Sequence, residues 1–278
     1  MGTKLYGLQL GRFGMDMETL LPGHPDFAAS PTHKDRDKAW YQCPSLAYVV
    51  EHPEGRILFD TGVSPRWREE WPDEYKIMDW EEIRPEDLLE PRLKSIGLGP
   101  EDFDFVVMGH LHADHAGGLR IFENAGAEIV VHEDELKGVL SLEEDANFMS
   151  RADYEFLPRK KPTLVYGDQQ LLKGVRLISL PGHTWGTMGM LVHLDRTGWV
   201  LCTSDAMLHH KTYGPPPVGN LYSISQEKWG RSIEKIRRYA TKYEAIVAPG
   251  HSETGIKHHA GGATDLVELG YYPGQVYE

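Results

Sequence analysis

Cysteine is scarce in this sequence, with only Cys43 and Cys202 among 278 residues. Two cysteines are too few to form the disulfide framework of a small secreted scaffold. Each lies between apolar neighbours, which predicts buried and chemically inert thiols.

Long apolar runs and long runs of one charge sign are also lacking. No segment approaches the ~20 apolar residues that a membrane span needs, and none follows Lys4 as a signal peptide requires. The formal net charge is -13 and the pI about 5.5, so the surface repels phosphate backbones and anionic lipids. We therefore expect a soluble cytoplasmic protein whose partner is a small-molecule substrate, not nucleic acid or a membrane.

The composition is that of an ordinary globular protein, with 40% hydrophobic and 26% charged residues. With no repeat and no low-complexity linker, we expect a single domain over 1–278. Strands are expected at 4–10, 45–50, 56–60, 103–108 and 128–132, and then at 175–180, 188–194, 199–203 and 245–249. Helices are expected at 85–97, 119–123, 133–140 and 225–243. Two groups of strands with helices between and after them predict two sheets packed face to face with helices outside.

Residues 63–84 interrupt this order with Trp67, Trp71, Tyr75 and Trp80 among many charged residues. An aromatic-rich insert of this length is typical of a lid over a site. The alternative is a surface excursion whose aromatic side chains pack on the body of the protein.

The main chemical signal follows the strand expected at 103–108. His110, His112, Asp114 and His115 lie within six positions, and a tight loop after a strand can aim all four side chains at one point. Imidazole and carboxylate ligands suit zinc, iron, manganese or cobalt. Because thiolates are absent, the set indicates an open catalytic site and not a closed structural one. Glycines at 117 and 118 permit close backbone approach beside this loop.

Three more candidate ligands, His183, Asp205 and His251, each follow another expected strand. Singly each is a weak signal. Together with the first four they make seven ligands, too many for one tetrahedral ion and suitable for two. The sequence therefore predicts a two-metal hydrolytic centre.

This ligand pattern resembles the motif of the metallo-β-lactamase superfamily. Further runs at 52–62, 110–118, 132–135, 204–206 and 213–216 are most similar to the N-acyl homoserine lactonases within it. The resemblance implies an α/β fold, the αββα four-layer sandwich, over nearly the whole chain. It also implies a homodimer and an enzyme that opens the lactone ring of N-acyl homoserine lactones.

The resemblance further implies a role for each ligand. One ion is held by His110, His112 and His183, the other by Asp114, His115 and His251, and Asp205 bridges them. Two divalent ions are implied, with zinc expected and iron, cobalt or manganese as alternatives. A hydroxide between the ions attacks the lactone carbonyl, and Asp114 also shuttles the proton. Asp60, at the end of its own strand, is expected to orient a ligand histidine or, alternatively, to cap a turn.

One position departs from the lactonase pattern. Those enzymes carry a tyrosine three residues after the bridging aspartate, where this chain has Leu208, which cannot donate a hydrogen bond. His209, His210 and Tyr213 are the candidates to replace that hydroxyl, and we assign catalytic roles to His209 and Tyr213. Adjacent histidines diverge, so at most one of His209 and His210 is expected to face the site.

Leu208 keeps a second function open, that of a dinuclear metallohydrolase of another lactone, a cyclic amide, a thioester or a phosphoester. Met15, Met17 and the insert are candidates to line an apolar acyl pocket, although plain packing or a dimer face would use the same residues. A di-iron electron-transfer protein and a non-catalytic binding protein are disfavoured, because no flavin-binding segment is found and the full ligand set is present.

Overall fold

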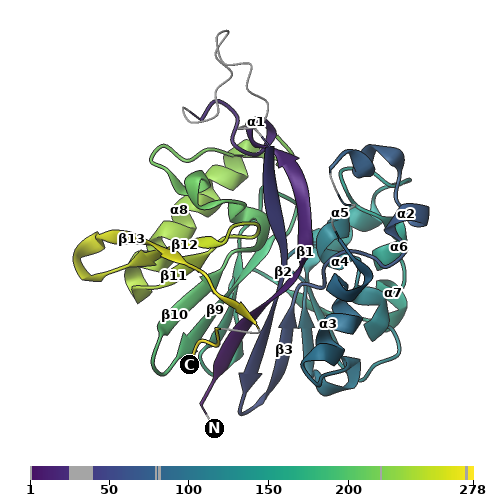
Figure 1. The fold of residues 1–278 in the computed structure, drawn as a ribbon, viewed down its shortest axis with the longest axis horizontal. Coiled ribbons are helices and arrows are strands. Elements are labelled where there is room, and N and C mark those ends of the chain that lie inside the picture. Colours follow the sequence, from purple (N-terminus) through teal and green to yellow (C-terminus); the bar gives the residue numbers. More distant parts are fainter. Residues whose placement is uncertain (1, 25–39, 79, 81–82, 220, 273–274) are drawn as a thin grey trace.

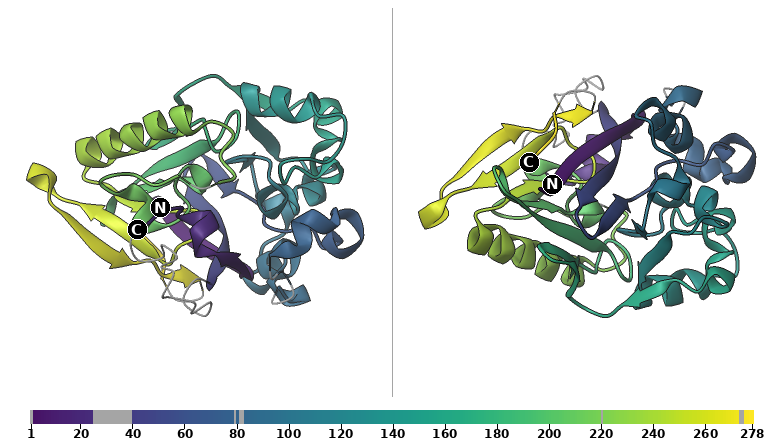
Figure 2. Two further views of the ribbon diagram at one scale, coloured as in Figure 1. Left: turned by 90° about the horizontal axis from the view of Figure 1, so that it is seen from above. Right: turned by 90° about the horizontal axis from the view of Figure 1, so that it is seen from below.

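Two mixed seven-stranded sheets form the centre of the computed structural model, which describes residues 2–24, 40–78, 80, 83–219, 221–272 and 275–278. The first sheet has the order β14 (Tyr271–Tyr272), β1 (Lys4–Asp16), β2 (Trp40–His52), β3 (Gly55–Phe59), β4 (Phe105–Val107), β5 (Glu128–His132), β6 (Thr163–Val165). The second has the order β13 (Thr264–Glu268), β12 (Thr254–His258), β11 (Ile246–Ala248), β10 (Gly198–Cys202), β9 (Met188–Leu194), β8 (Val175–Ser179), β7 (Gln169–Leu172). Figure 2 shows the two sheets facing each other.

Alternation along the strands divides the apolar side chains between two faces of each sheet. In β4, Val107 points between the sheets, where it packs in a core shared with Val192 and Val200. Its neighbour Val106 points to the opposite face and packs against helices. This is the period of two that a pleated strand imposes. Both cysteines are buried, as the sequence predicts.

Helices cover the outer face of each sheet (Figure 1). The first sheet is covered by α3 (Leu89–Ser95), α4 (Ala113–Ala116), α5 (Glu133–Leu140), α6 (Arg151–Tyr154) and α7 (Leu157–Lys160). The second is covered by α8 (Gln226–Tyr243), whose Trp229, Ile233 and Ile236 are buried on one stripe. Of two further short helices, α1 (Met17–Leu20) lies at one end of the sheets, and α2 (Trp67–Glu70) lies on the outer side of the helices that cover the first sheet. The predicted four-layer αββα sandwich is confirmed. Within the described residues, no helix has the length and apolarity to cross a membrane.

Most predicted elements are found close to their expected bounds. The bounds of β5, α5 and β9 agree with the prediction, and the strands expected at 45–50 and 56–60 lie in the antiparallel pair β2–β3. The helix expected at 85–97 is split into a short 3-10 turn (Pro85–Asp87) and α3. Strands β1 and β2 are 13 residues long each, far beyond the apolar runs that mark them in the sequence. The two strands pair along their length, with a register shift between Gln9 and Arg12. This pairing extends both strands over polar residues that lie outside the apolar runs.

Strand direction brings five loops to one end of the sandwich. β3 and β4 are parallel, as are β10 and β11, and β8 runs in the direction of β10 because each is antiparallel to β9. The residues that follow the carboxyl ends of these strands therefore lie at a shared edge. A hydrogen bond from Met188 N to Gly109 O, 2.6 Å long, joins the two sheets there.

The insert at 63–84 packs on the body of the protein. Trp67, Trp71, Tyr75 and Trp80 are all buried, in a cluster that also holds residues of β1 and β2. Trp80 stacks on Phe13 with ring centroids 4.4 Å apart. The burial of its aromatic side chains is compatible with both interpretations of the insert, a lid and a surface excursion. Residues 79, 81 and 82 lie outside the described part of the chain.

A buried carboxylate beneath the insert gives a stability prediction. Burial raises the pKa of Asp153 in α6 to about 7. Since this value lies above that of the unfolded chain, the unfolded state loses its proton first, and stability falls as pH rises from about 4 to about 7. In Asp153→Asn this loss should be absent. We expect the variant to gain about 1–3 kcal/mol over the native protein on going from pH 5 to pH 8, measured by urea unfolding. Equal pH dependence of the two proteins would contradict a neutral Asp153.

Candidate metal centre

Seven polar side chains converge at the shared edge of the two sheets. Six are buried and Asp114 is half-buried, with 13% of its side chain exposed. They are the residues that the sequence predicts as ligands, namely His110, His112, Asp114, His115, His183, Asp205 and His251. They come from the loops after β4, β8, β10 and β11.

The loop after β4 supplies four of the seven within one tight turn. His112 is the N-cap residue of α4, so Asp114 and His115 leave from the first turn of that helix. The close backbone approach predicted here is present: a Cβ on Gly117 would lie 2.0 Å from Ser64 N. A larger residue at Gly117 would push the loop away from its neighbour.

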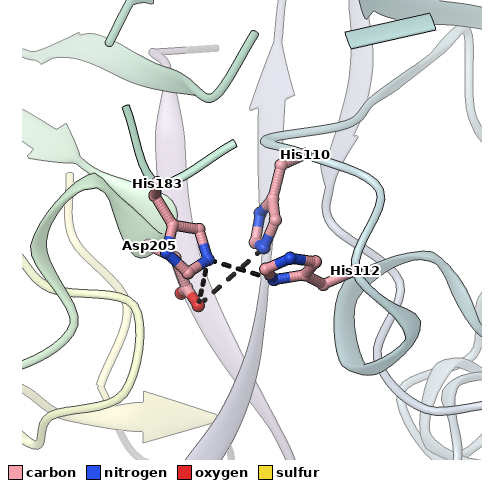
Figure 3. Close-up of side chains that lie close together, drawn as sticks. All are labelled: His110, His112, His183 and Asp205. Atoms are coloured by element: carbon pink, nitrogen blue, oxygen red, sulfur yellow. Dashed lines mark hydrogen bonds and ion pairs between the residues drawn. The ribbon is translucent and has the colours of Figure 1, made fainter. Parts of the chain in front are cut away.

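His110, His112, His183 and Asp205 form the first cluster, called cluster A (Figure 3). His183 Nε2 lies 3.0 Å from His112 Nδ1 and 3.4 Å from Asp205 Oδ2. His110 Nε2 lies 3.8 Å from Asp205 Oδ2. Figure 3 shows the three imidazole rings and the carboxylate pointing toward one another.

Asp114, His115, His251 and Asp205 form the second cluster, called cluster B. His115 Nε2 and His251 Nε2 are 3.3 Å apart, and each lies 3.1–3.3 Å from Asp205 Oδ1. Asp114 Oδ2 lies 3.6 Å from His115 Nε2 and 3.5 Å from His251 Nε2. Asp205 is the residue shared by the two clusters, and it presents a different oxygen to each.

Both clusters fit a divalent cation. Ligand atoms placed ~2.1 Å from a tetrahedral ion are ~3.4 Å from one another, within the range of the distances above. His251 Nδ1 lies 2.9 Å from Pro44 O, which can only accept, so Nδ1 carries the proton and Nε2 presents a lone pair. Among the described residues, His110 Nε2 and Asp205 Oδ1 have no hydrogen-bond partner. A buried polar atom without a partner costs free energy, and a bound cation would be the partner of both atoms.

Burial acts on the ionisation of cluster A. It lowers the pKa of His110 and of His112 well below the ordinary imidazole value. Both rings are therefore neutral at neutral pH and keep a lone pair available for an ion.

Cluster B has a different balance. Burial lowers the pKa of His115 and of His251, but neighbouring carboxylates, Asp205 above all, outweigh it and raise both values. Despite burial, His251 and His115 in turn hold the pKa of Asp205 well below its usual range. The carboxylate oxygens of cluster B therefore favour positive charge at this point. A bound cation would supply that charge, and the imidazoles would then stay neutral.

Asp60 lies where the sequence predicts it, beside a ligand histidine. Its Oδ2 is 3.0 Å from His115 Nδ1 and accepts from Ser204 Oγ at 3.0 Å, and its Oδ1 accepts from Gly109 N at 2.6 Å. A carboxylate on the far nitrogen fixes the orientation of the His115 ring and directs Nε2 into cluster B.

A small apolar pocket of about 20 Å³ opens on both clusters. Besides ligands, the described residues that line it are Met15, Met78, Trp80, Phe148, Leu208 and Tyr222. Met78 and Trp80 belong to the insert, so part of the insert covers the site. Tyr222 and Phe148 were not predicted: they lie in irregular segments without periodicity, and no sequence signal marks them.

The two residues predicted to replace a catalytic hydroxyl are placed elsewhere. The hydroxyl of Tyr213 forms a hydrogen bond with His258 Nε2 at 2.7 Å, on the side of the second sheet that faces α8. His209 is buried against Tyr41, and burial lowers its pKa to about 3. Neither residue lines the pocket over the clusters. Leu208 lines this pocket, whereas His209 and Tyr213 lie outside it.

Comparison with known proteins agrees with this geometry. The model of the family described as the metallo-beta-lactamase superfamily matches residues 40–251. The N-acyl homoserine lactonase AiiB of Agrobacterium fabrum is 28% identical over 265 residues, covering 90% of this chain and 94% of that protein. An N-acyl homoserine lactonase of Bacillus cereus is 28% identical over 260 residues, covering 89% and 92%. A solved N-acyl homoserine lactone hydrolase, with the product N-hexanoyl-L-homoserine bound at its catalytic metal centre, has a TM-score of 0.73 and 26% identity, covering 91% and 94%. All seven ligand positions fall within the matched region.

Proposed function

Because the chain belongs to the metallo-beta-lactamase superfamily, we propose that it opens the lactone ring of N-acyl homoserine lactones by hydrolysis at two divalent ions. The observation that carries the proposal is that both clusters share Asp205 and open on one apolar pocket. Zinc is the expected ion, with iron, cobalt and manganese as alternatives, because imidazole and carboxylate ligands accept all four.

Two ions bound here would supply an activated water at neutral pH and would polarise the substrate carbonyl. Asp205 would contribute one carboxylate oxygen to each ion. Asp114 is the ligand with the most exposed side chain, and it lines the pocket. It is therefore placed to take a proton from the attacking water and to deliver it to the leaving oxygen.

The pocket wall supports a neutral and apolar substrate. Among its described lining residues there is no lysine or arginine that would pair with an anionic group. Met15 and Met78 have flexible side chains that can adjust to an acyl chain. A cavity of about 20 Å³ is smaller than any such chain, so these side chains must move when substrate binds.

We propose that Tyr222, which lines the pocket, provides the hydroxyl that Leu208 lacks. Of the described lining residues outside the ligand set, it is the one with a hydroxyl group. Its ring packs edge-on against Phe148 with centroids 4.9 Å apart. Burial, with a contribution from Asp16, raises the pKa of Tyr222, so the phenol stays protonated and is able to donate.

Removing this hydroxyl should slow the reaction. We expect Tyr222→Phe to lower kcat/KM by about 10- to 100-fold, the effect of losing a hydrogen bond to an oxygen that gains charge. Leu208→Tyr in the same background should restore part of the activity, because position 208 lines the same pocket. Tyr213→Phe is the matched control and should change kcat/KM little. Equal losses in the Tyr222 and Tyr213 variants would contradict the assignment.

A direct assay separates the proposal from the second candidate, a dinuclear hydrolase with another substrate, which Leu208 favours. Acid release is followed by pH-stat with homoserine lactones carrying acyl chains of four to twelve carbons. Saturable turnover that disappears with chelator supports the lactonase proposal. Turnover of only phosphotriesters, thioesters or cyclic amides would replace it with the second candidate.

A further inference from the structure

The buried carboxylate of Glu135 connects two of the loops that hold cluster A. Glu135 lies in the first turn of α5 and is 1% exposed. Its Oε1 accepts from Leu111 N at 2.9 Å, and its Oε2 accepts from Gly186 N at 2.8 Å. Burial raises its pKa, while hydrogen bonds from Thr184, Gly186 and Leu111 act in the opposite direction and favour the charged form.

The two N–H donors belong to ligand loops from different sheets. Leu111 stands between His110 and His112, and Gly186 follows His183 by three residues. The contact is close, since a Cβ on Gly186 would lie 2.6 Å from the backbone nitrogen of Glu135. One carboxylate thus fixes the relative position of the loops that carry all three imidazoles of cluster A.

Cluster B is supported by other groups. Asp60 holds the far nitrogen of His115, and the Pro44 carbonyl accepts from that of His251. Neither of these contacts involves Glu135. A change at Glu135 should therefore act on one cluster more than on the other.

We propose that Glu135 is a positioning residue for cluster A. Its carboxylate holds the 110–112 and 183–186 loops at the spacing that one ion requires. The inference rests on the two-ion centre and not on the lactone substrate. Partners that orient metal ligands commonly contribute ~10- to 100-fold to metal affinity. Without the carboxylate, the two backbone N–H groups are left buried and unpaired, and the loops separate to hydrate them.

The test is metal binding by Glu135→Gln and Glu135→Ala, measured by elemental analysis after dialysis and by titration of the metal-free proteins with Co²⁺. We expect affinity for one of the two ions to fall ~10- to 100-fold and the other to change little. Glu135→Gln should lose less than Glu135→Ala, because its amide oxygen still accepts one N–H. Glu133→Gln, in the same helical turn but paired with Lys137, is the control and should bind two ions normally.

Double variants identify the cluster affected. His183→Ala leaves cluster B, so adding Glu135→Gln should not change the remaining affinity. His251→Ala leaves cluster A, and adding Glu135→Gln should then weaken the remaining ion. Equal weakening in both backgrounds, or two tightly bound ions in Glu135→Gln alone, would overturn the proposal. Because the readout is bound metal, the result does not depend on whether lactones are hydrolysed.

Discussion

Asp205→Ala should bind neither ion tightly and should lose at least about 1,000-fold in kcat/KM. Asp205 is the residue common to both clusters, with Oδ2 3.4 Å from His183 Nε2 and Oδ1 3.1 Å from His251 Nε2. Its removal takes one ligand from each ion and also the negative charge that balances them. Five buried imidazoles would then face two cations with only Asp114 as an anionic ligand.

Two matched variants make the Asp205 result specific. Asp205→Asn keeps the shape and one ligand oxygen, so it should retain one ion better than the other and show an intermediate loss. Asp134→Ala removes a carboxylate whose side chain is 64% exposed and should leave both metal content and turnover unchanged. Two tightly bound ions in Asp205→Ala would show that the shared carboxylate does not bridge.

Removal of metal from the native protein is expected to have the second largest effect. A strong chelator should reduce hydrolysis to background and lower the Tm, and added Zn²⁺ should restore both. A ligand present at 1,000 times its Kd stabilises the folded state by about 4 kcal/mol, and two ions act together here. Thermal unfolding with and without chelator measures this contribution.

The Asp205→Ala protein is the control for the chelator experiment. Because that variant should bind little metal, chelator should not shift its Tm. A shift of equal size in both proteins would mean that the chelator acts elsewhere. Full turnover by the native protein after exhaustive chelation would show that hydrolysis does not require a bound metal.

Much of the fold follows from local pattern, since β4, β5 and α5 are marked by short apolar runs and helical periodicity. The edges of the sheets were harder to predict. β6 and β7 contain polar residues such as Thr163 and Gln169, and their pairing with neighbouring strands, not their composition, makes them strands. The extension of β1 to Asp16 likewise depends on pairing with β2.

The same distinction between local sequence pattern and long-range contact applies to the residues of the site. The metal ligands were predictable because each is a metal-competent residue directly after a strand, and strand ends meet at one edge. Glu135 and Tyr222 were not, because their importance comes from contacts over long sequence separations, as from Glu135 to Gly186. The position of Tyr213 has the same origin: nearness in sequence to Asp205 suggested a shared pocket, whereas the Tyr213 hydroxyl forms a hydrogen bond with His258 on β12 and the residue does not line the pocket.

Anomalous diffraction from crystals of the dialysed active protein tests the two-ion centre most directly. Data collected on either side of the absorption edge of the bound metal should show two peaks per chain. One should lie among His110, His112 and His183, the other among Asp114, His115 and His251, with Asp205 between them. Peaks elsewhere, or none in a protein that still turns over substrate, would contradict the account.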